Sequence, residues 1–296
     1  MYHYRLYGMN ICSDLEFSQL CVGDCSESQV SIRQGKMPAD VQESSQGQYF
    51  FGPERSWLHN RTAWILAEGG NRLTYQLKDG ASQAYLQTYL LGYGMSMLAM
   101  QQGRLAMHCS AVRNSRGAVL ISGESGSGKS TLTTQFLQHG YQLMADDLAV
   151  VLPEKGKRPE AYPAFPFQKL CRDAALDRGY SLQELRYINE DKDKFLVPYQ
   201  GEFSCEPAPV LAMLILGKIH GNEIAVRRLC GMEKFYAVGG NLFLRKLLGA
   251  DRFSPRNGEK YLDFAAETEI FFIGRPEGKN TLSQVTDRAF QCLEGL

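Results

Sequence analysis

Eight consecutive residues match the pattern G-x-x-x-x-G-K-[S/T], in which a glycine-rich turn holds phosphate groups. The run is Gly123-Glu124-Ser125-Gly126-Ser127-Gly128-Lys129-Ser130, with Thr131 directly after it. Glycines let successive backbone N–H groups converge on phosphate oxygens, because no Cβ obstructs the approach. Lys129 adds a positive charge for the terminal phosphates, and the Ser130 hydroxyl is a ligand type that Mg²⁺ accepts. The run therefore predicts a nucleotide-binding loop over residues 123–131.

The flanking residues have the pattern that such a loop requires. Residues 118–122 are apolar and predict a buried strand, whereas residues 130–139 place Leu132, Phe136 and Leu137 on one side of a predicted helix. The N-terminus of that helix adds unpaired N–H groups and a partial positive charge. The alternative is a chance glycine-rich turn, which the strand and helix context disfavours.

Two adjacent carboxylates, Asp146 and Asp147, stand between a predicted strand over residues 141–145 and another over 148–152. Neighbouring carboxylates repel each other unless a cation or a shared proton lies between them. A Mg²⁺-nucleotide supplies the cation, so that one carboxylate can hold the metal while the other accepts a proton from an attacking hydroxyl. The alternative is an exposed polar turn, since Asp is common in turns.

His108 lies in a predicted strand that pairs with residues 118–122 through the turn at 114–117. This hairpin would place His108 near the phosphate loop. A single histidine in a strand is more often a hydrogen-bonded core residue, and only its neighbours give it a functional role.

Together these features resemble the catalytic core of the HPr kinase/phosphorylase family. His108, the loop and the pair Asp146-Asp147 occur in the same order and at similar spacing as in that family. The chain is more similar still to the HPr-kinase-like serine kinases found beside clusters for ribosomally made peptides, including lasso-peptide tailoring kinases. The resemblance implies that His108 and Asp146 act at the reacting hydroxyl, with Asp146 as general base. It also implies that Lys129 binds phosphates and that Ser130, with Asp147, organises Mg²⁺.

The resemblance covers residues 104–152. HPr kinases carry a later glycine-rich signature with an arginine and a metal-binding glutamate, and this chain lacks it. Residues 162–170 are instead similar to the peptide-kinase branch, so a peptide or small protein other than HPr is the expected acceptor. The second metal carboxylate stays open among Asp193, Glu202 and Glu206. An ABC-type ATPase is disfavoured by the lack of a Leu-Ser-Gly-Gly signature.

Composition excludes several other classes. The charges balance, with 32 Lys+Arg and 32 Asp+Glu in 296 residues and no polybasic block, which argues against nucleic acid as the main partner. The eight cysteines include no C-x-x-C pair, which argues against a zinc site and suits a reducing cytoplasm. The N-terminus lacks the basic and apolar regions of a signal peptide, and residues 84–100 are too interrupted by polar residues for a membrane span. A soluble cytoplasmic protein without a membrane partner is expected.

The predicted fold is α/β, with a β-rich N-terminal module over residues 1–82 and a P-loop core of the HPr kinase/phosphoenolpyruvate carboxykinase type over 83–296. Predicted strands of the module are 2–7, 29–34, 48–51, 62–66 and 72–77. Predicted later elements are helices 82–102, 173–189, 233–248 and 282–293, strands 195–198, 209–217 and 270–276, and a hairpin partner 223–228 for strand 209–217. An open edge of the module is a hypothetical docking surface for a peptide. A solvated position is the preferred interpretation for a set of later cations: Lys192, Lys194, Arg245, Lys246, Arg252 and Arg256.

The predicted activity is transfer of the γ-phosphate of ATP, with Mg²⁺, to a serine hydroxyl of a peptide or small protein. GTP and pyrophosphate stay open as donors, and one of the later cations is expected to stabilise the transferring group. HPr kinases are hexameric, so the resemblance also favours a homo-oligomer. Two alternatives remain at this point: a non-catalytic switch that responds to nucleotide, and a kinase of a small metabolite.

Overall fold

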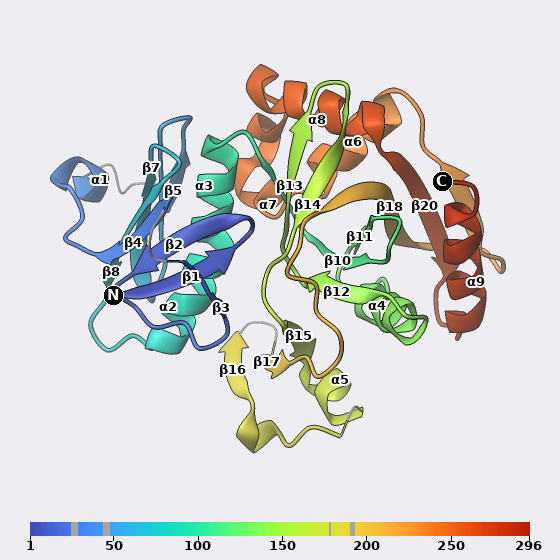
Figure 1. Ribbon diagram of the computed structural model, residues 1–296, viewed down its shortest axis with the longest axis horizontal. Helices are drawn as coiled ribbons and strands as arrows, with labels where there is room; N and C mark the ends of the chain where they lie inside the picture. The colour runs from blue at the N-terminus through green and yellow to red at the C-terminus, as the bar shows by residue number, and fades with distance from the viewer. Residues whose placement is uncertain (25–28, 44–47, 178, 190–192) are drawn as a thin grey trace.

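The computed structural model describes residues 1–24, 29–43, 48–177, 179–189 and 193–296 (Figure 1). Strands of these residues form three sheets, and helices pack between and around them. The mixed α/β character and the richness in strands are confirmed. The division at residue 82 and the kinase type of the core stay predictions. Cys25 and Lys192 lie outside the described residues.

The first sheet is built from the N-terminal part of the chain. Its strand order in the described residues is β3-β1-β2-β4-β8-β7-β6-β5. The strands are β1 (Tyr2–Leu6), β2 (Met9–Ser13), β3 (Cys21–Val22), β4 (Val30–Gln34), β5 (Tyr49–Phe51), β6 (Arg55–His59), β7 (Ala63–Glu68) and β8 (Arg72–Leu77). Strands β2, β3 and β6 and the short helix α1 (Ala39–Glu43) were not predicted. The five predicted strands are present, and their ends differ from the predicted ones by at most two residues.

A long helix lies between the first and second sheets (Figure 1). It consists of α2 (Gln83–Tyr89), the π-helical segment η1 (Leu90–Gly94) and α3 (Met95–Gln101). Ser82 caps its start, because the Ser82 side-chain oxygen accepts a hydrogen bond from the N–H of Ala84. A Cβ on Gly94 would lie 3.0 Å from Leu73 Cδ1, so this glycine lets the helix approach the first sheet closely. The predicted helix over residues 82–102 is confirmed.

The second sheet contains the glycine-rich run. Its order is β12-β10-β11-β18-β14-β13-β9, and β18 also pairs with β20, which pairs with β19. The strands are β9 (Leu105–Met107), β10 (Cys109–Arg113), β11 (Ala118–Gly123), β12 (Gln142–Ala145), β13 (Ala149–Glu154), β14 (Lys157–Tyr162), β18 (Ala208–Ile219), β19 (Ala225–Arg228) and β20 (Glu269–Pro276). Strands β11, β18 and β20 are parallel, whereas β10 is antiparallel to both β11 and β12.

Helices cover both faces of this sheet. On one face, α4 (Lys129–Gln138) and α9 (Leu282–Leu293) form an apolar core with the strands. On the other, α6 (Met232–Gly240) and α8 (Pro255–Glu267) join a core that continues into the first sheet. Strand β11 is buried on both sides. Val119 and Ile121 face the core formed with α4 and α9, whereas Ala118 and Leu120 face the core that continues into the first sheet. This double burial explains the continuous apolar run before the loop.

The predicted helix over residues 173–189 is wrong beyond its first turns. Helix α5 (Arg172–Asp177) ends early, and a 3-10 turn η2 (Leu182–Glu184) and strand β16 (Arg186–Asn189) follow. Gly179 has φ +78°, its N–H donates to the Leu176 carbonyl, and the Tyr180 N–H donates to the Ala175 carbonyl. These two bonds form the glycine-terminated C-cap that stops a helix. Strand β16 then pairs with β17 (Lys194–Pro198), which pairs with β15 (Phe167–Cys171), to form the small third sheet.

Two further predictions need correction. Strand β19 does not form a hairpin with β18, because β20 lies between them and pairs with both. The predicted helix over residues 233–248 is divided into α6 and α7 (Arg245–Leu248), followed by the 3-10 segment η3 (Gly249–Phe253). The intervening residues follow strand β9 instead, since the Phe243 N–H donates to the Ala106 carbonyl and Leu242 bridges Met107.

None of the helices that the structure describes is long and apolar enough to span a membrane. The cysteines of the described residues carry free thiols: Cys12, Cys21, Cys109, Cys171, Cys205, Cys230 and Cys292.

Candidate active site

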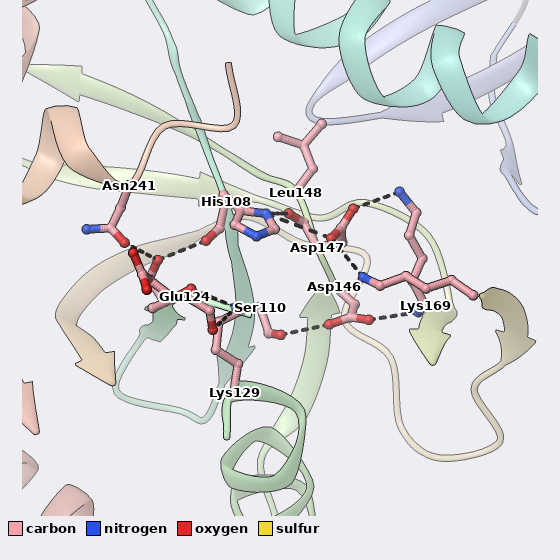
Figure 2. A network of polar contacts seen from close by, with 12 residues as sticks. His108, Ser110, Glu124, Lys129, Asp146, Asp147, Leu148, Lys169 and Asn241 are labelled. Carbon is pink, nitrogen blue, oxygen red and sulfur yellow. Dashed lines mark hydrogen bonds and ion pairs between the residues drawn. The ribbon is translucent and has the colours of Figure 1, made fainter. Parts of the chain in front are cut away.

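The topology of the second sheet brings the predicted site residues to one edge. Strands β11 and β12 run in the same direction on either side of the antiparallel strand β10. The loop that follows Gly123, the aspartate pair that follows Ala145 and the start of β10 at His108 therefore meet. Ligands of open α/β sheets bind at the carboxyl ends of the strands, which is this edge. Figure 2 shows His108, Lys129, Asp146 and Asp147 gathered there.

The glycine-rich run forms a tight turn between β11 and α4. Gly123, Gly126 and Gly128 have φ values of +133°, +78° and +105°, which L-residues with side chains rarely adopt. A Cβ on Gly123 would lie 2.2 Å from the Leu216 carbonyl oxygen, so that position requires glycine. A Cβ on Gly126 would have no atom within 4 Å, so the loop is accessible from that side.

Ser127 supplies a donor inside the loop. Its side chain is buried, and its hydroxyl has no hydrogen-bond partner among the residues that the structure describes. The first N–H groups of α4, from Lys129 onward, also point out of the helix end without intrahelical acceptors. A buried unpaired hydroxyl beside free backbone donors fits an anion such as a phosphate group.

Two cations donate hydrogen bonds to different carbonyl groups of the loop. The Lys129 ammonium donates to the carbonyl oxygens of Gly123 and Glu124, at 2.7 and 3.0 Å (Figure 2). Arg275, at the end of β20, donates from Nε to the Ser127 carbonyl and from its terminal nitrogen to the Gly126 carbonyl, at 2.9 and 2.8 Å. Because C=O and N–H of one peptide are coplanar and point in opposite directions, holding the Ser127 carbonyl also fixes the direction of the following N–H.

Asp146 is held by two uncharged donors. The Ser110 hydroxyl donates to Oδ1 at 2.7 Å, and the backbone N–H of Lys169 donates to Oδ2 at 2.9 Å (Figure 2). The first donor comes from β10 and the second from β15 of the third sheet. These bonds fix the plane of the carboxylate beside the loop, and each oxygen keeps a further lone pair that can accept a proton or a hydrogen bond.

Asp147 lies in a different environment, among cations. Its Oδ2 is 2.8 Å from the Lys169 ammonium, and its Oδ1 is 3.7 Å from the Lys194 ammonium. Burial alone would raise the pKa of Asp147, but the charges of Lys169 and Lys194 hold it well below its usual range. Asp147 also has φ +69°, a left-handed conformation that Asp tolerates better than most residues and that is common at functional sites.

His108 stands in the break between β9 and β10, not within the hairpin as predicted. The backbone N–H of His108 donates to the Asn241 carbonyl, and the ring Nδ1 lies 3.0 Å from the Asp147 carbonyl oxygen. A carbonyl only accepts, so Nδ1 carries the proton and Nε2 is the acceptor of the neutral ring. Burial lowers the pKa of His108, and the charge of Lys129 adds to this, against the opposing charge of Asp147. His108 is therefore neutral at pH 7.

The other predicted residues have mixed positions. Glu124, Ser125 and Thr131 are exposed in or beside the loop, and Ser130 is half-buried in the first turn of α4. The candidates for a second metal carboxylate lie in other contacts: Asp193 pairs with Arg172 at 2.6 Å, and Glu202 accepts a hydrogen bond from Gln142. The interpretation of Lys194 as a solvated residue is wrong, because β17 directs it to Asp147.

Sequence reasoning missed three residues of this edge, Ser110, Lys169 and Arg275. Ser110 is two positions after His108, and alternation along a strand would have placed both side chains on one face. Lys169 and Arg275 carry no local signal, because they reach the site from the third sheet and from the far parallel strand.

The residues present fit a nucleotide phosphate better than they fit a preformed metal site. In the described part of the chain no three His, Cys, Asp or Glu side chains gather as a metal site. Mg²⁺ commonly binds through one or two protein ligands together with substrate phosphates, and the Ser130 hydroxyl suits that mode. Asp147 would have to exchange the Lys169 ammonium for the metal, so its role as a ligand stays a prediction.

Comparisons with known proteins add one distant likeness. The chain matches no protein-family model, and no curated protein matches it. Among solved structures it is similar to the HPr(Ser) kinase/phosphatase from Coxiella burnetii, at 11% sequence identity and a TM-score of 0.29. The match covers 63% of this chain and 90% of that one. A likeness this distant carries no argument about activity, and it leaves the branch of the predicted family undetermined.

Proposed function

We propose that this protein is an ATP-dependent kinase that transfers the γ-phosphate to a serine hydroxyl of a peptide or small protein. The observation that carries the proposal is a juxtaposition at one sheet edge. A glycine-rich loop that leads into the N-terminus of α4, with a buried hydroxyl and a lysine, lies beside Asp146, a carboxylate that two uncharged donors hold in place. Phosphoryl transfer needs these two parts, a cradle for the phosphates and a base for the acceptor hydroxyl.

The roles follow from the contacts of each residue. The loop amides, the Ser127 hydroxyl and Lys129 bind the phosphates, and Lys129 exchanges its loop carbonyls for phosphate oxygens. Asp146 accepts the proton of the acceptor hydroxyl, while Ser110 and the Lys169 N–H keep its carboxylate oriented. The neutral His108 ring offers Nε2 as an acceptor beside the same hydroxyl, which matches its implied supporting role.

Cations around the loop suit the charge that develops in transfer. Burial lowers the pKa of Lys129, and the charges of Lys194 and Arg245 lower it further, so both lie close enough to act on it. We therefore propose Lys194 and Arg245 as the later cations that stabilise the charge of the transferring phosphoryl group. Mg²⁺, when bound through Ser130, would bridge and neutralise the phosphate oxygens.

The identity of the phosphate acceptor is the most specific part of the proposal. We infer a peptide or small protein of the kind modified by peptide-tailoring kinases, on the motif resemblance of residues 104–152. ATP is the proposed donor, and GTP and pyrophosphate serve as competing donors in the test.

The test is phosphate transfer from γ-labelled ATP with Mg²⁺ in a fractionated lysate of the protein's own organism. The wild type is compared with Lys129→Ala and Asp146→Asn, and Lys155→Ala on an exposed turn serves as the matched control. A labelled peptide or protein band that both site variants lose and the control keeps would support the proposal. A labelled metabolite alone would identify a small-molecule kinase. Nucleotide binding without any labelled product would contradict a kinase and favour a switch.

A further inference from the structure

A cavity of about 350 Å³ lies outside the candidate active site, between α3, β9, α7 and α8. Volumes from about 300 Å³ upward are typical of sites for small molecules. Its walls are largely apolar, formed in part by Met100, Leu105, Leu242 and Leu248. None of the residues assigned above to the phosphate loop, to the aspartate pair or to His108 lines it, so the proposed nucleotide site does not account for it.

The charges that line this cavity are mostly positive. Arg104, Arg256 and Lys260 line it against one carboxylate, Glu259, among the described residues. Arg256 is exposed and donates to the Gln101 carbonyl, which places a guanidinium at the open side. Lys260 forms an ion pair with Asp263 at 3.5 Å, which leaves Arg104 and Arg256 as the cations set against Glu259. An anionic group is therefore the complementary partner at the mouth.

The buried side of the cavity holds an unpaired hydroxyl. Ser96 lines the cavity, is fully buried, and its Oγ has no hydrogen-bond partner in the part of the chain that the structure describes. Hydroxyls inside helices usually donate to the carbonyl four residues earlier. Thr88, Thr133 and Thr286 do so in this chain. Ser96 follows the π-helical segment η1, where that spacing is broken.

We propose that this cavity is a binding site for a small apolar molecule with an anionic end and a polar atom at the other end. The apolar part of the ligand packs on the apolar walls, and its anionic group lies near Arg256. The polar atom at its other end forms a hydrogen bond with the Ser96 hydroxyl. Pairing an otherwise orphaned buried hydroxyl favours such a ligand over one with a plain hydrocarbon end.

The same cavity is joined to the candidate active site by residues 241–244. Leu242 and Leu244 line the cavity. Asn241 precedes Leu242; its carbonyl accepts a hydrogen bond from the backbone N–H of His108, and its Oδ1 accepts one from the Ser122 hydroxyl at 2.7 Å. Phe243 lies between the two leucines in the sequence, and its ring packs against the His108 ring. A ligand that moves Leu242 therefore acts on the position of His108. The coupling is reciprocal, so nucleotide binding would also change ligand affinity.

Binding is measured by calorimetry on the full chain with three probes: ω-hydroxyoctanoate, octanoate and octylamine. The hydroxy acid should bind one site per chain, about fivefold more tightly than octanoate, and octylamine should not saturate. In Ser96→Ala the advantage of the hydroxy acid should vanish. Arg256→Glu should weaken both acids, whereas Arg288→Glu on α9 should weaken neither. Absence of saturable binding by either acid, or affinities unchanged in both cavity variants, would overturn the proposal.

The link to the active site has its own readout. The chain has five histidines, and His108→Gln identifies the His108 ring resonance by its loss. Saturation with ω-hydroxyoctanoate should shift that resonance in the wild type. An unshifted His108 resonance with the cavity filled would refute the link. Neither experiment requires phosphate transfer, so failure of the proposed kinase activity would leave both results intact.

Discussion

Replacing Lys169 by methionine tests how the buried carboxylate of Asp147 is stabilised. Methionine keeps the length of the side chain but removes the ammonium group that lies 2.8 Å from Asp147 Oδ2. Only 16% of the lysine and 15% of the aspartate side chain is exposed, so water replaces the lost partner poorly. The Lys194 ammonium, 3.7 Å from Oδ1, stays as the nearest cation. The backbone N–H of residue 169 still donates to Asp146.

The size of the expected loss in unfolding free energy follows from the burial of the ion pair and from Lys194, the cation that remains. Removing one partner of a fully buried ion pair costs about 3–5 kcal/mol, and a charged hydrogen bond contributes about 1.5–3 kcal/mol. Because Lys194 still compensates part of the charge, we expect Lys169→Met to lower the free energy of unfolding by about 2–3 kcal/mol at pH 7. The exposed pair of Lys157 with Glu154 provides a control, and Lys157→Met should have no measurable effect.

The pH dependence gives a sharper test than the size alone. In the wild type the pKa of Asp147 is depressed, so this carboxylate stabilises the fold above its unfolded pKa of about 3.9, and the stabilisation is lost as pH falls toward the folded value. Without Lys169, burial is opposed more weakly, so the pKa of Asp147 rises, and protonation then removes a charge that Lys194 compensates only in part. The difference in unfolding free energy between wild type and variant should therefore shrink from pH 7 to about pH 4.

Urea denaturation at several pH values measures this difference directly. Lys169→Met combined with Asp147→Asn should recover part of the loss at pH 7, because no buried charge is left unpaired. A difference that stays constant with pH, or a double variant no more stable than Lys169→Met, would refute the electrostatic account of Asp147.

Three further predictions concern the loop and the base. Lys129→Ala should weaken Mg²⁺-ATP binding at least about tenfold by calorimetry, because it removes a positive charge that binds the phosphates. The control Lys155→Ala should leave the affinity unchanged. Equal affinities of wild type and Lys129→Ala would exclude the loop as the phosphate site. Arg275→Met removes two hydrogen bonds to loop carbonyls and should weaken the same binding about fivefold, with loop amides exchanging hydrogen faster. Unchanged binding and exchange would show that the loop holds its shape without Arg275. Asp146→Asn should keep the Kd for ATP but lower transfer about 100-fold or more, and full activity would rule it out as the base.

The strand, loop and helix around Gly123 were predictable because their signals are local. Apolar residues, glycines with positive φ and helix periodicity stand next to each other in the chain, and each has a direct structural consequence. The aspartate pair was predictable as a strand end for the same reason. That these features meet at one edge required the sheet order, which the sequence implies only through the resemblance.

The residues that were missed act over long sequence separations. Arg275 reaches the loop from a strand that lies two positions away in the sheet, and nothing near it in sequence indicates a glycine turn as its partner. Lys194 belongs to a charged run, which ordinarily indicates solvent, but pairing of β17 with β15 turns it inward. The helix predicted through Gly179 failed for a local reason: a glycine able to adopt positive φ outweighed the helix-forming residues around it.

The two adjacent aspartates show how neighbouring residues of one type acquire different chemistry. Asp147 has a left-handed backbone, and its carboxylate contacts other groups than the carboxylate of Asp146 does. Asp147 meets two ammonium groups, and its pKa is held low by them, which makes it a poor acceptor for a hydroxyl proton. Asp146 accepts hydrogen bonds from a hydroxyl and a backbone N–H, and among the described residues no ammonium group forms an ion pair with it. Lys169 contacts both carboxylates, because its ammonium donates to Asp147 and its backbone N–H donates to Asp146. Under the proposed function, this division favours Asp146 as the base, while Asp147 holds Lys169 and Lys194 in place.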